Sequence, residues 1–341
     1  MHFFLTGHTG FKGSWLVLLL RQLGHKVSGL ALDPPEKGLF ALANLESEME
    51  SHLIADIRNS EAVRIALHKT KPDFAIHLAA QPLVLEAYEN PLTTYTTNVN
   101  GTLNFLEALS SMEKPPISLV ITTDKVYRDD GKVAYKESDP LGGHDPYSAS
   151  KAMADILTQS WIATNPHLRL FVARAGNVIG MFDTCDNRII PDLRKAADTG
   201  EPIQVRNPGS VRPWQHVFDC LSGYVRLLLV AQNNSEGLPK VFNFGPMRES
   251  VRTVSELVSV AQSYDNKINA VQAEGSNMRK ETEFLALDSS RAEAVLGWQN
   301  LISFELAVEL SLEKPLASPK LAAKRQLDSF LDLGPRRWLT I

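Results

Sequence analysis

The chain has 341 residues, of which 44% are hydrophobic and 22% charged, as in an ordinary globular protein. Its formal net charge of −4 argues against nucleic acid or an anionic membrane as a partner, and two cysteines without a CxxC pair argue against a disulfide framework or a structural metal site. With no evident signal peptide and no apolar run long enough to cross a bilayer, we expect a cytoplasmic protein without a bound metal.

The first part of the chain predicts a βαβ unit with a glycine-rich first turn. We expect a strand at 2–5, a helix at 14–23 and a second strand at 26–32, with the glycines before the helix. In such a turn, glycine allows a sharp bend and the close approach of a pyrophosphate, which the free amides of the helix N-terminus bind. The turn therefore predicts a dinucleotide site made by Gly7, Thr9, Gly10, Phe11, Lys12 and Gly13.

Aspartates follow the next two predicted strands. Asp33 ends the second strand, where a carboxylate can bind the adenosine ribose hydroxyls and repel a 2′-phosphate, so we expect NAD rather than NADP. The alternative is that Asp33 only forms a turn with the two prolines after it. Asp56, in a strand predicted at 53–57, is expected with Ile57 beside the adenine, or as a cap of the helix predicted at 62–68.

A fourth strand is predicted at 74–81, and a long helix is predicted to begin at Pro91. Small side chains at the end of the strand would allow a bound cofactor to approach the backbone closely. The candidate cofactor contacts of this region are Ala79, Ala80, Gln81 and Asn98.

The apolar run at 117–122 predicts a buried parallel strand. The polar residues that follow it, at the carboxyl end where open α/β sheets bind ligands, are Thr123, Asp124 and Lys125. Tyr147 and Lys151 are four residues apart in a predicted helix, so they share a face. An ammonium beside a phenol, whose ordinary pKa is about 10, favours the phenolate and makes it a usable base.

Strands and helices alternate up to a strand predicted at 168–174, which indicates an α/β fold with a Rossmann-like doubly wound parallel sheet. We expect an NAD-binding domain at 1–175, with later pieces of the sheet near 211–245. Residues 176–325 should form mainly a smaller, substrate-binding part, and 326–341 a C-terminal tail.

The turn motif TGxxGxxG, Asn98 in TNVNGT, Thr123 at a strand end and the YxxxK of Tyr147 and Lys151 together resemble the extended short-chain dehydrogenase/reductase family. A more specific set of segments is similar to the CDP-glucose 4,6-dehydratases, within the NAD-dependent epimerases and dehydratases of that family. These segments are GHTGFKGSWL, MESHLIADIR, AAQPLV, TDKVY, GGHDPYSASK, RAGNVIG, RIIPD, RPWQHV and NFGP.

The resemblance implies an NAD-dependent nucleotide-sugar 4,6-dehydratase acting on CDP-glucose. Such an enzyme oxidises the sugar at C4, eliminates water across C5 and C6, and returns the hydride to C6. It implies that Thr123 and Tyr147 bind the C4 oxygen, with Tyr147 as the base, and that Lys151 holds the nicotinamide ribose. Asp124 would be the acid for the departing C6 hydroxyl. Lys125 would be the base at C5, or would stabilise the enolate while another group or water moves the proton.

The candidate contacts of the nucleotide sugar are Asn177, Arg188, Arg212, Gln81, His144 and His216. The first three are amide and guanidinium donors, which suit a diphosphate. Gln81 and the two histidines could line the sugar or base pocket, although a lone histidine in such a loop is more often structural. His144 and a short loop at 128–137 depart from the family pattern, which bears on the sugar and the nucleotide rather than on the reaction type.

Two other functions stay open. A nucleotide-sugar 4-epimerase needs the same cofactor, Tyr147 and Lys151, but not the acid-base pair that Asp124 and Lys125 would form. A non-catalytic dinucleotide-binding protein would bind NAD and turn over no sugar.

The family usually dimerises through two helices of each subunit, so the resemblance implies a homodimer or a tetramer. Here these helices would lie around 92–112 and 147–164. Their apolar faces, which would also suit packing on the sheet, are Leu103, Leu106, Leu109, Ile156, Leu157 and Trp161. The resemblance also implies a role in making deoxysugars for O-antigen or another surface glycan.

Overall fold

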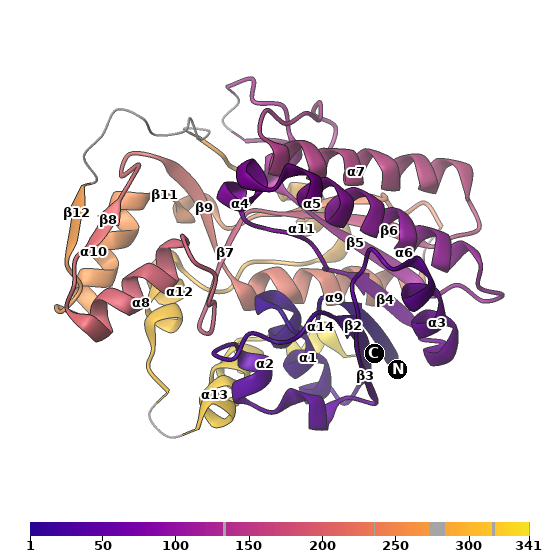
Figure 1. The fold of residues 1–341 in the computed structure, drawn as a ribbon, viewed down its shortest axis with the longest axis horizontal. Coiled ribbons are helices and arrows are strands. Elements are labelled where there is room, and N and C mark those ends of the chain that lie inside the picture. Colours follow the sequence, from indigo (N-terminus) through magenta and orange to yellow (C-terminus); the bar gives the residue numbers. More distant parts are fainter. Residues whose placement is uncertain (132–133, 235, 273–283, 316–317, 341) are drawn as a thin grey trace.

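The computed structural model describes residues 1–131, 134–234, 236–272, 284–315 and 318–340. A parallel sheet of seven strands forms its centre, in the order β10-β6-β5-β4-β1-β2-β3 (Figure 1). The strands are β1 (His2–Thr6), β2 (Lys26–Ala31), β3 (Ser51–Ile54), β4 (Phe74–His77), β5 (Ile117–Thr123), β6 (Leu170–Ala175) and β10 (Val241–Phe244). The order from β3 to β6 is that of a doubly wound dinucleotide-binding fold, so the predicted fold class is confirmed.

Helices cover both faces of the sheet. Those on one face are α1 (Phe11–Gln22) and α9 (Val217–Asn233), and those on the other are α3 (Ser60–Thr70), α6 (Gly101–Ser110) and α7 (Pro146–Thr164) (Figure 1). Successive side chains of a strand point to opposite faces. Phe3 and Leu5 of β1 therefore pack with α1 and α9, whereas Phe4 packs with α3 and α6.

Two strands end earlier than predicted. β3 spans Ser51–Ile54 rather than 53–57, and β4 ends at His77 rather than at residue 81. Among the described residues, β3 is an edge strand that pairs with β2 alone, and the chain leaves the sheet after the last paired residue, Ile54. As a result, the candidate cofactor contacts after these strands lie in loops at the carboxyl edge of the sheet.

The helix predicted to begin at Pro91 is a continuous helical segment in three parts. α5 (Pro91–Tyr95) leads into a π-helical turn at Thr96–Asn100, and α6 follows directly. Asn98 lies in the wider π turn, a feature that is frequent at functional sites.

The second half of the chain adds a smaller part that contains two small sheets. In one, β9 (Val211–His216) lies between β7 (Asn177–Ile179) and β11 (Val251–Thr253), and in the other β8 (Ile203–Val205) pairs with β12 (Ala270–Gln272). The helices beside them are α8 (Ile189–Thr199), α10 (Val254–Tyr264) and α12 (Phe304–Leu312) (Figure 1). Between these elements in the sequence, β10 returns to the edge of the main sheet.

The C-terminal helices α13 (Pro319–Asp332) and α14 (Arg336–Leu339) pack on the main domain. Phe330 and Leu339 are buried in the same core as α1 and α9, and the ring centroids of Phe218 and Phe330 are 5.3 Å apart. Because α13 begins at Pro319, the segment expected as a tail from residue 326 starts inside a helix.

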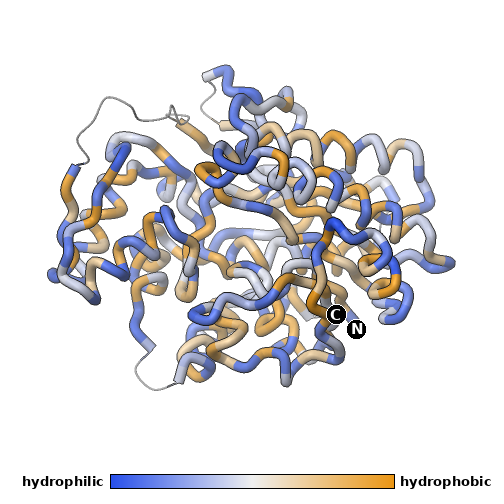
Figure 2. Tube along the Cα trace, in the orientation of Figure 1, coloured by the Kyte–Doolittle hydropathy of each residue, from blue (hydrophilic) through white to orange (hydrophobic). Residues whose placement is uncertain are grey.

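The remaining short elements are α2 (Leu39–Leu42), α4 (Val84–Glu89), α11 (Ser290–Leu296) and 3₁₀ turns at Leu45–Glu48, Asp124–Val126 and Arg248–Ser250. Figure 2 shows hydrophobic residues along the central strands and hydrophilic residues on many outer loops. Within the described residues, no helix combines the length and the apolar character needed to cross a membrane.

Candidate functional site

A cleft of about 670 Å³ lies where the carboxyl ends of β5 and β6 meet the smaller part of the protein. Its wall on the sheet side includes Thr123, Asp124, Lys125 and Tyr147. Its wall on the other side includes Asn177, Arg188, Arg212 and Trp214. The fold therefore brings four of the five predicted catalytic residues and three candidates for nucleotide-sugar binding, far apart in the sequence, to one cavity. The described lining of the cleft does not include the fifth, Lys151.

Asp124 is a buried carboxyl group at the end of β5. Thr123, the last residue of the strand, donates from Oγ1 to Asp124 Oδ1 at 2.8 Å. Asp124 Oδ2 is buried without a hydrogen-bond partner among the described residues, and a side chain at Gly176 would come within 3.1 Å of it. Burial raises the pKa of Asp124, against the opposing charge of Lys125. A carboxyl group in this setting favours its protonated form and can act as an acid.

The helix that carries Tyr147 and Lys151 begins at a well-defined cap. Asp145 accepts a hydrogen bond from the backbone amide of Ser148 at 2.9 Å, and Pro146 takes the first helical position. This cap starts α7 next to the end of β5, where Tyr147 faces the cleft beside Thr123.

Burial shifts the pKa values of Tyr147 and Lys151 in the directions that favour their uncharged forms. It raises the pKa of Tyr147 to about 12, while the hydrogen bond with Thr123 and the charge of Arg188 act in the opposite direction. It lowers the pKa of Lys151 to about 7, with the charge of Lys12 adding to the effect and that of Asp155 opposing it. Lys151 Nζ donates to the carbonyl of Ile121 at 2.8 Å, which holds the side chain of Lys151 against β5.

The glycine-rich turn can accept a diphosphate. Gly7 has φ of +73°, and a Cβ there would lie 2.8 Å from the backbone of Ala79. A Cβ at Gly13 would lie 2.2 Å from the carbonyl oxygen of Gly7, so the tight turn requires glycine at both positions. Gly10 precedes α1, whose first amides have no acceptors within the helix and point out of its N-terminus. These features fit the pyrophosphate of a dinucleotide.

Two other side chains of this turn are Thr9, which is buried, and Lys12, which is partly buried. Thr9 donates from Oγ1 to the carbonyl of Leu32 at 2.9 Å and so holds the turn against the end of β2. Lys12 reaches into the cleft, with Nζ 3.4 Å from Tyr224 Oη. Burial lowers the pKa of Lys12, and the charge of Arg188 acts in the same direction.

The loop after β4 is held by amide hydrogen bonds. Asn98 Oδ1 accepts from the backbone of Gln81 at 2.8 Å, and Asn98 Nδ2 donates to Ser150 on α7 at 2.9 Å. The side chain of Gln81 bonds to Leu83 and Thr94. Both amides thus join protein segments that surround the cleft, and their direct contacts with a ligand remain predictions.

The two aspartates predicted to contact the adenosine differ in their surroundings. Asp33 is exposed beyond the end of β2. Asp56 forms an ion pair with Arg58 at 2.6 Å, which lowers the pKa of Asp56. The alternative role of Asp56 as a helix cap is wrong, because Asn59 caps α3 by accepting from Ala62. Ile57 is buried and packs on Gly101, where an added Cβ would lie 2.7 Å from its Cγ2.

The candidate substrate residues also differ in placement. Arg188 lines the cleft and forms an ion pair with Asp183 at 3.1 Å, and Arg212 lines it from β9. His216 is buried and caps α9 by accepting the amide of Phe218, and burial lowers the pKa of its imidazole to about 3. His144 is exposed. Among the described residues, the lining of the cleft includes neither histidine.

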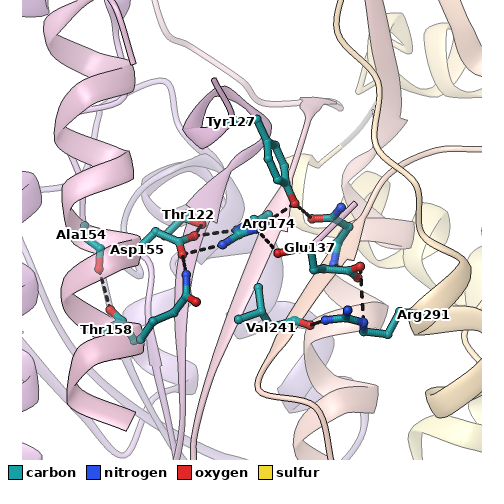
Figure 3. A network of polar contacts seen from close by, with 11 residues as sticks. Thr122, Tyr127, Glu137, Ala154, Asp155, Thr158, Arg174, Val241 and Arg291 are labelled. Atoms are coloured by element: carbon teal, nitrogen blue, oxygen red, sulfur yellow. Dashed lines mark hydrogen bonds and ion pairs between the residues drawn. The ribbon is translucent and has the colours of Figure 1, made fainter. Parts of the chain in front are cut away.

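A buried polar network beside the cleft was not predicted from the sequence. It joins Thr122, Tyr127, Glu137, Asp155, Arg174 and Arg291 (Figure 3). The signal that could have revealed it is an arginine near the end of an otherwise apolar strand, LFVARA, because a buried charge must be paired.

Comparison with known proteins relates the chain to nucleotide-sugar dehydratases. A family model described as GDP-mannose 4,6 dehydratase matches residues 4–310. The chain is 41% identical over 309 residues to the CDP-glucose 4,6-dehydratase of Salmonella typhimurium, covering 86% of this chain and 85% of that protein. It is 28% identical over 327 residues to a dTDP-glucose 4,6-dehydratase of Xanthomonas campestris pv. campestris, covering 91% of each.

Solved structures share the fold at lower identity. The dTDP-glucose 4,6-dehydratase of Bacillus anthracis, in complex with NAD, superposes with a TM-score of 0.77 at 22% identity, covering 92% of this chain and 95% of that one. A UDP-glucuronic acid 4-epimerase of Bacillus cereus, in complex with UDP-glucuronic acid and NAD, gives 0.78 at 21% identity, with coverage of 96% and 100%. Dehydratases and epimerases are thus equally similar in fold, so the backbone alone does not separate them.

Proposed function

The chain belongs to the GDP-mannose 4,6-dehydratase family, and we propose that it is an NAD-dependent lyase that converts CDP-glucose to CDP-4-keto-6-deoxyglucose. The observation that carries the reaction type is the buried, partly unpartnered carboxyl group of Asp124 beside Lys125, in the same cleft as Thr123 and Tyr147. An elimination of water needs such an acid, whereas an epimerisation does not. The similarity to a CDP-glucose 4,6-dehydratase supports the substrate.

The cofactor would lie along the carboxyl edge of the sheet. Bound NAD⁺ would supply a hydride acceptor for sugar C4 and, once reduced, a hydride donor for C6. The amides at the start of α1 would bind its pyrophosphate, and Asp33 would bind the adenosine ribose. Lys151 would bind the nicotinamide ribose. The other side chains proposed to surround the cofactor are Thr9, Phe11, Lys12, Asp56, Ile57, Ala79, Ala80, Gln81 and Asn98.

Tyr147 and Thr123 would act on the C4 hydroxyl. Thr123 Oγ1 would hold the C4 oxygen, and Tyr147 Oη would take its proton as the hydride leaves. Because burial raises the pKa of Tyr147, nearby positive charge is needed to make the phenolate accessible. The charge of Arg188 lowers the pKa of Tyr147, and Lys151, four residues away on the same face of α7, would add to this effect when it is protonated.

Asp124 and Lys125 would carry out the elimination. The ketone at C4 makes the hydrogen on C5 acidic, so a base can remove it. Burial raises the pKa of Asp124, and in its protonated form Asp124 would give its proton to the C6 hydroxyl, which leaves as water. Lys125 lines the cleft next to it, and would either accept the C5 proton or stabilise the enolate.

The nucleotide diphosphate would bind on the opposite wall. Arg188 and Arg212 can present guanidinium groups to the phosphates, with Asn177 as an amide donor beside them. Gln81 and His216 stay candidates for the sugar and base pocket. Because His216 is buried and its Nδ1 caps α9, the protein around His216 would have to rearrange before this side chain could contact the substrate.

The direct test is to incubate the purified protein with CDP-glucose and NAD⁺, and in parallel with dTDP-glucose, UDP-glucose and GDP-mannose. We expect mass spectrometry to show the loss of one water from CDP-glucose, together with the alkaline absorbance of a 4-keto sugar. Loss of water from another nucleotide sugar would keep the reaction and overturn the substrate. An isomer of unchanged mass would instead identify a 4-epimerase, and NAD binding without turnover would identify a non-catalytic protein.

We also propose a homodimer that buries an apolar strip on α6 and α7. Leu103, Met153 and Ile156 are 36%, 48% and 53% exposed, respectively. Leu106 and Leu109, which the sequence placed on the same apolar face, are instead buried against the sheet. The exposed strip is therefore narrower than expected, and it includes Ile156.

An Ile156→Glu variant is expected to shift the protein from dimer to monomer, because a carboxylate cannot be buried unpaired in an apolar interface. Light scattering coupled to size-exclusion chromatography would measure the mass. Ile65→Glu on α3 is the matched control, because Ile65 is 49% exposed and lies outside the strip. A wild-type monomer, or an unchanged dimer in Ile156→Glu, would refute this interface.

We further propose that the enzyme acts in the cytoplasm and supplies a deoxysugar for O-antigen or another surface glycan. The two free cysteines, Cys185 and Cys220, suit a reducing compartment. The glycan role rests on the resemblance to CDP-glucose 4,6-dehydratases.

A further inference from the structure

Arg174 is the central residue of the buried polar network beside the cleft (Figure 3). It lies on β6 with no exposed surface, and its neighbours across the sheet are Thr122 on β5 and Asn243 on β10. Its guanidinium binds Asp155 through two parallel hydrogen bonds, of 2.8 Å from Nε and 2.7 Å from Nη2. On the other side, Nη1 donates to Tyr127 Oη at 2.9 Å, and the guanidinium carbon lies 4.9 Å from the Tyr127 ring centroid.

The bond to Asp155 ties Arg174 to the helix that carries the proposed redox base. Tyr147, Lys151 and Asp155 are each four residues apart on α7, so they form one stripe that faces the sheet. Asp155 also accepts from Thr122 Oγ1 at 2.8 Å, one residue before Thr123. The last member of the stripe is thus held by β5 and β6 together, which fixes the rotation and the axial position of α7.

The bond to Tyr127 ties the same guanidinium to the turn that carries the proposed elimination pair. Tyr127 follows the 3₁₀ turn Asp124–Val126, and its hydroxyl donates to Asn243 Oδ1 at 2.6 Å. Its ring stacks on Tyr135, with centroids 5.0 Å apart. The chain that leaves Asp124 and Lys125 is therefore anchored two residues later.

The geometry of the two sets of bonds suits the placement of their partners. A buried ion pair loses much of its attraction to the cost of removing both charges from water, so apolar residues of similar volume can be equally stable. A guanidinium fork is directional, however, and holds its partners in one geometry. Apolar contacts would allow α7 to slide or rotate, and a shift of about 1 Å at a reacting group can cost on the order of 10²-fold in rate.

We propose that Arg174 is a positioning residue that holds Tyr147 on α7 and the Asp124–Lys125 turn in one fixed arrangement, so that a sugar oxidised at C4 is already aligned for elimination across C5 and C6. This proposal rests on the proposed function. It predicts that the two arms of Arg174 affect different halves of the reaction, which a residue with only a structural role would not do.

Two conservative variants separate the arms. Tyr127→Phe removes only the hydroxyl on the turn side, so oxidation at C4 should proceed while elimination slows by about tenfold or more. Rapid mixing with CDP-glucose should then show NADH absorbance that builds up before water is lost. Asp155→Asn weakens the arm on α7, so oxidation itself should slow and no NADH should build up. Arg174→Lys keeps the charge but not the fork, and should lower kcat while KM changes less than about twofold.

Arg291→Met is the matched control. Arg291 ends the same network through an ion pair with Glu137 at 3.4 Å, and Glu137 accepts from the backbone amide of Asn243. Its loss should lower the melting temperature without changing the balance between NADH build-up and water loss. If Tyr127→Phe and Asp155→Asn lose activity only in proportion to their folded fraction, with the wild-type balance, the positioning role is refuted.

Amide hydrogen exchange tests the placement of α7 without any turnover. We expect faster exchange across Pro146–Thr164 in Arg174→Lys than in the wild type, and no such change in Arg291→Met. Equal exchange in the wild type and Arg174→Lys would overturn the proposal. If the wild type removes water from no nucleotide sugar, the proposed function fails, and the exchange experiment still decides whether Arg174 holds the helix.

Discussion

A Tyr147→Phe variant is expected to lose about 10³-fold in kcat, within the range by which a positioned acid or base contributes to catalysis. The phenol lines the cleft beside Thr123, and is the group placed to take the proton from the C4 hydroxyl. Phenylalanine fills the same volume, so folding and NAD affinity should be close to those of the wild type. Mass spectrometry of the product and calorimetric titration with NAD⁺ would measure the two effects separately.

The pH profile gives this prediction a second readout. A base acts in its deprotonated form, and burial raises the pKa of Tyr147 to about 12, so the wild-type rate should rise with pH above neutrality. Tyr147→Phe should lose that rise. Tyr264→Phe is the control, because Tyr264 is 46% exposed on α10. A Tyr147→Phe enzyme that keeps more than about a tenth of the wild-type rate would exclude the phenol as the base.

An Asp124→Asn variant is expected to stop after the first half of the reaction, with kcat lower by about 10²-fold to 10³-fold. Asparagine keeps an oxygen that can accept from Thr123 but has no acidic proton for the departing C6 hydroxyl. Oxidation at C4 does not need this proton, so NADH should build up while no water is lost. Rapid-mixing absorbance and mass spectrometry of quenched samples would follow the two steps.

The structure predicts the direction in which Asp124→Asn changes the pH dependence of the free energy of unfolding. The pKa of Asp124 is raised in the folded protein, so its contribution to stability is largest at low pH and is lost as pH rises through the folded value. Above that pH the wild type carries a buried charge that the amide lacks. As pH rises, the variant should therefore lose less stability than the wild type, which thermal melts over a series of pH values would check.

Asp183→Asn is the matched control for Asp124→Asn. Asp183 is 6% exposed and lines the same cleft, but its carboxylate pairs with Arg188. Its loss should change KM through Arg188 and produce no build-up of NADH. Normal dehydration by Asp124→Asn, or the same build-up in both variants, would contradict the role of Asp124 as the acid.

The elements that carry the site follow from local features of the sequence. Hydrophobic runs predicted the central strands, and the alternation of strands and helices predicted the parallel sheet, which the structure confirms. The glycine spacing predicted a tight turn, and contacts at Gly7 and Gly13 leave no room for a side chain. The spacing of Tyr147 and Lys151 placed them on one face of a helix, because the helical period depends only on nearby residues.

Strand ends were less predictable than strand positions. Apolar and small residues continue past the last hydrogen-bonded pair of β3 and β4, so the pattern runs on into the loops. The same limit applies to the expected dimer face, where the period of the helix does not distinguish Leu103, which is exposed, from Leu106, which packs on the sheet. A hydrophobic residue reports that burial is favourable, and not which partner covers it.

The sequence by itself therefore determined the fold class, the dinucleotide turn and the residue types at the strand end and on α7. Only the tertiary structure decided which polar groups are buried together. These are the Asp124 oxygen that has no hydrogen-bond partner among the described residues, the guanidinium of Arg174 between Asp155 and Tyr127, and the imidazole of His216 that caps α9. The physical reason is that helical period and turn geometry arise from neighbours in the chain. Burial, by contrast, and the pKa shifts and ion pairs that it imposes, depend on segments that meet only when the whole chain has folded.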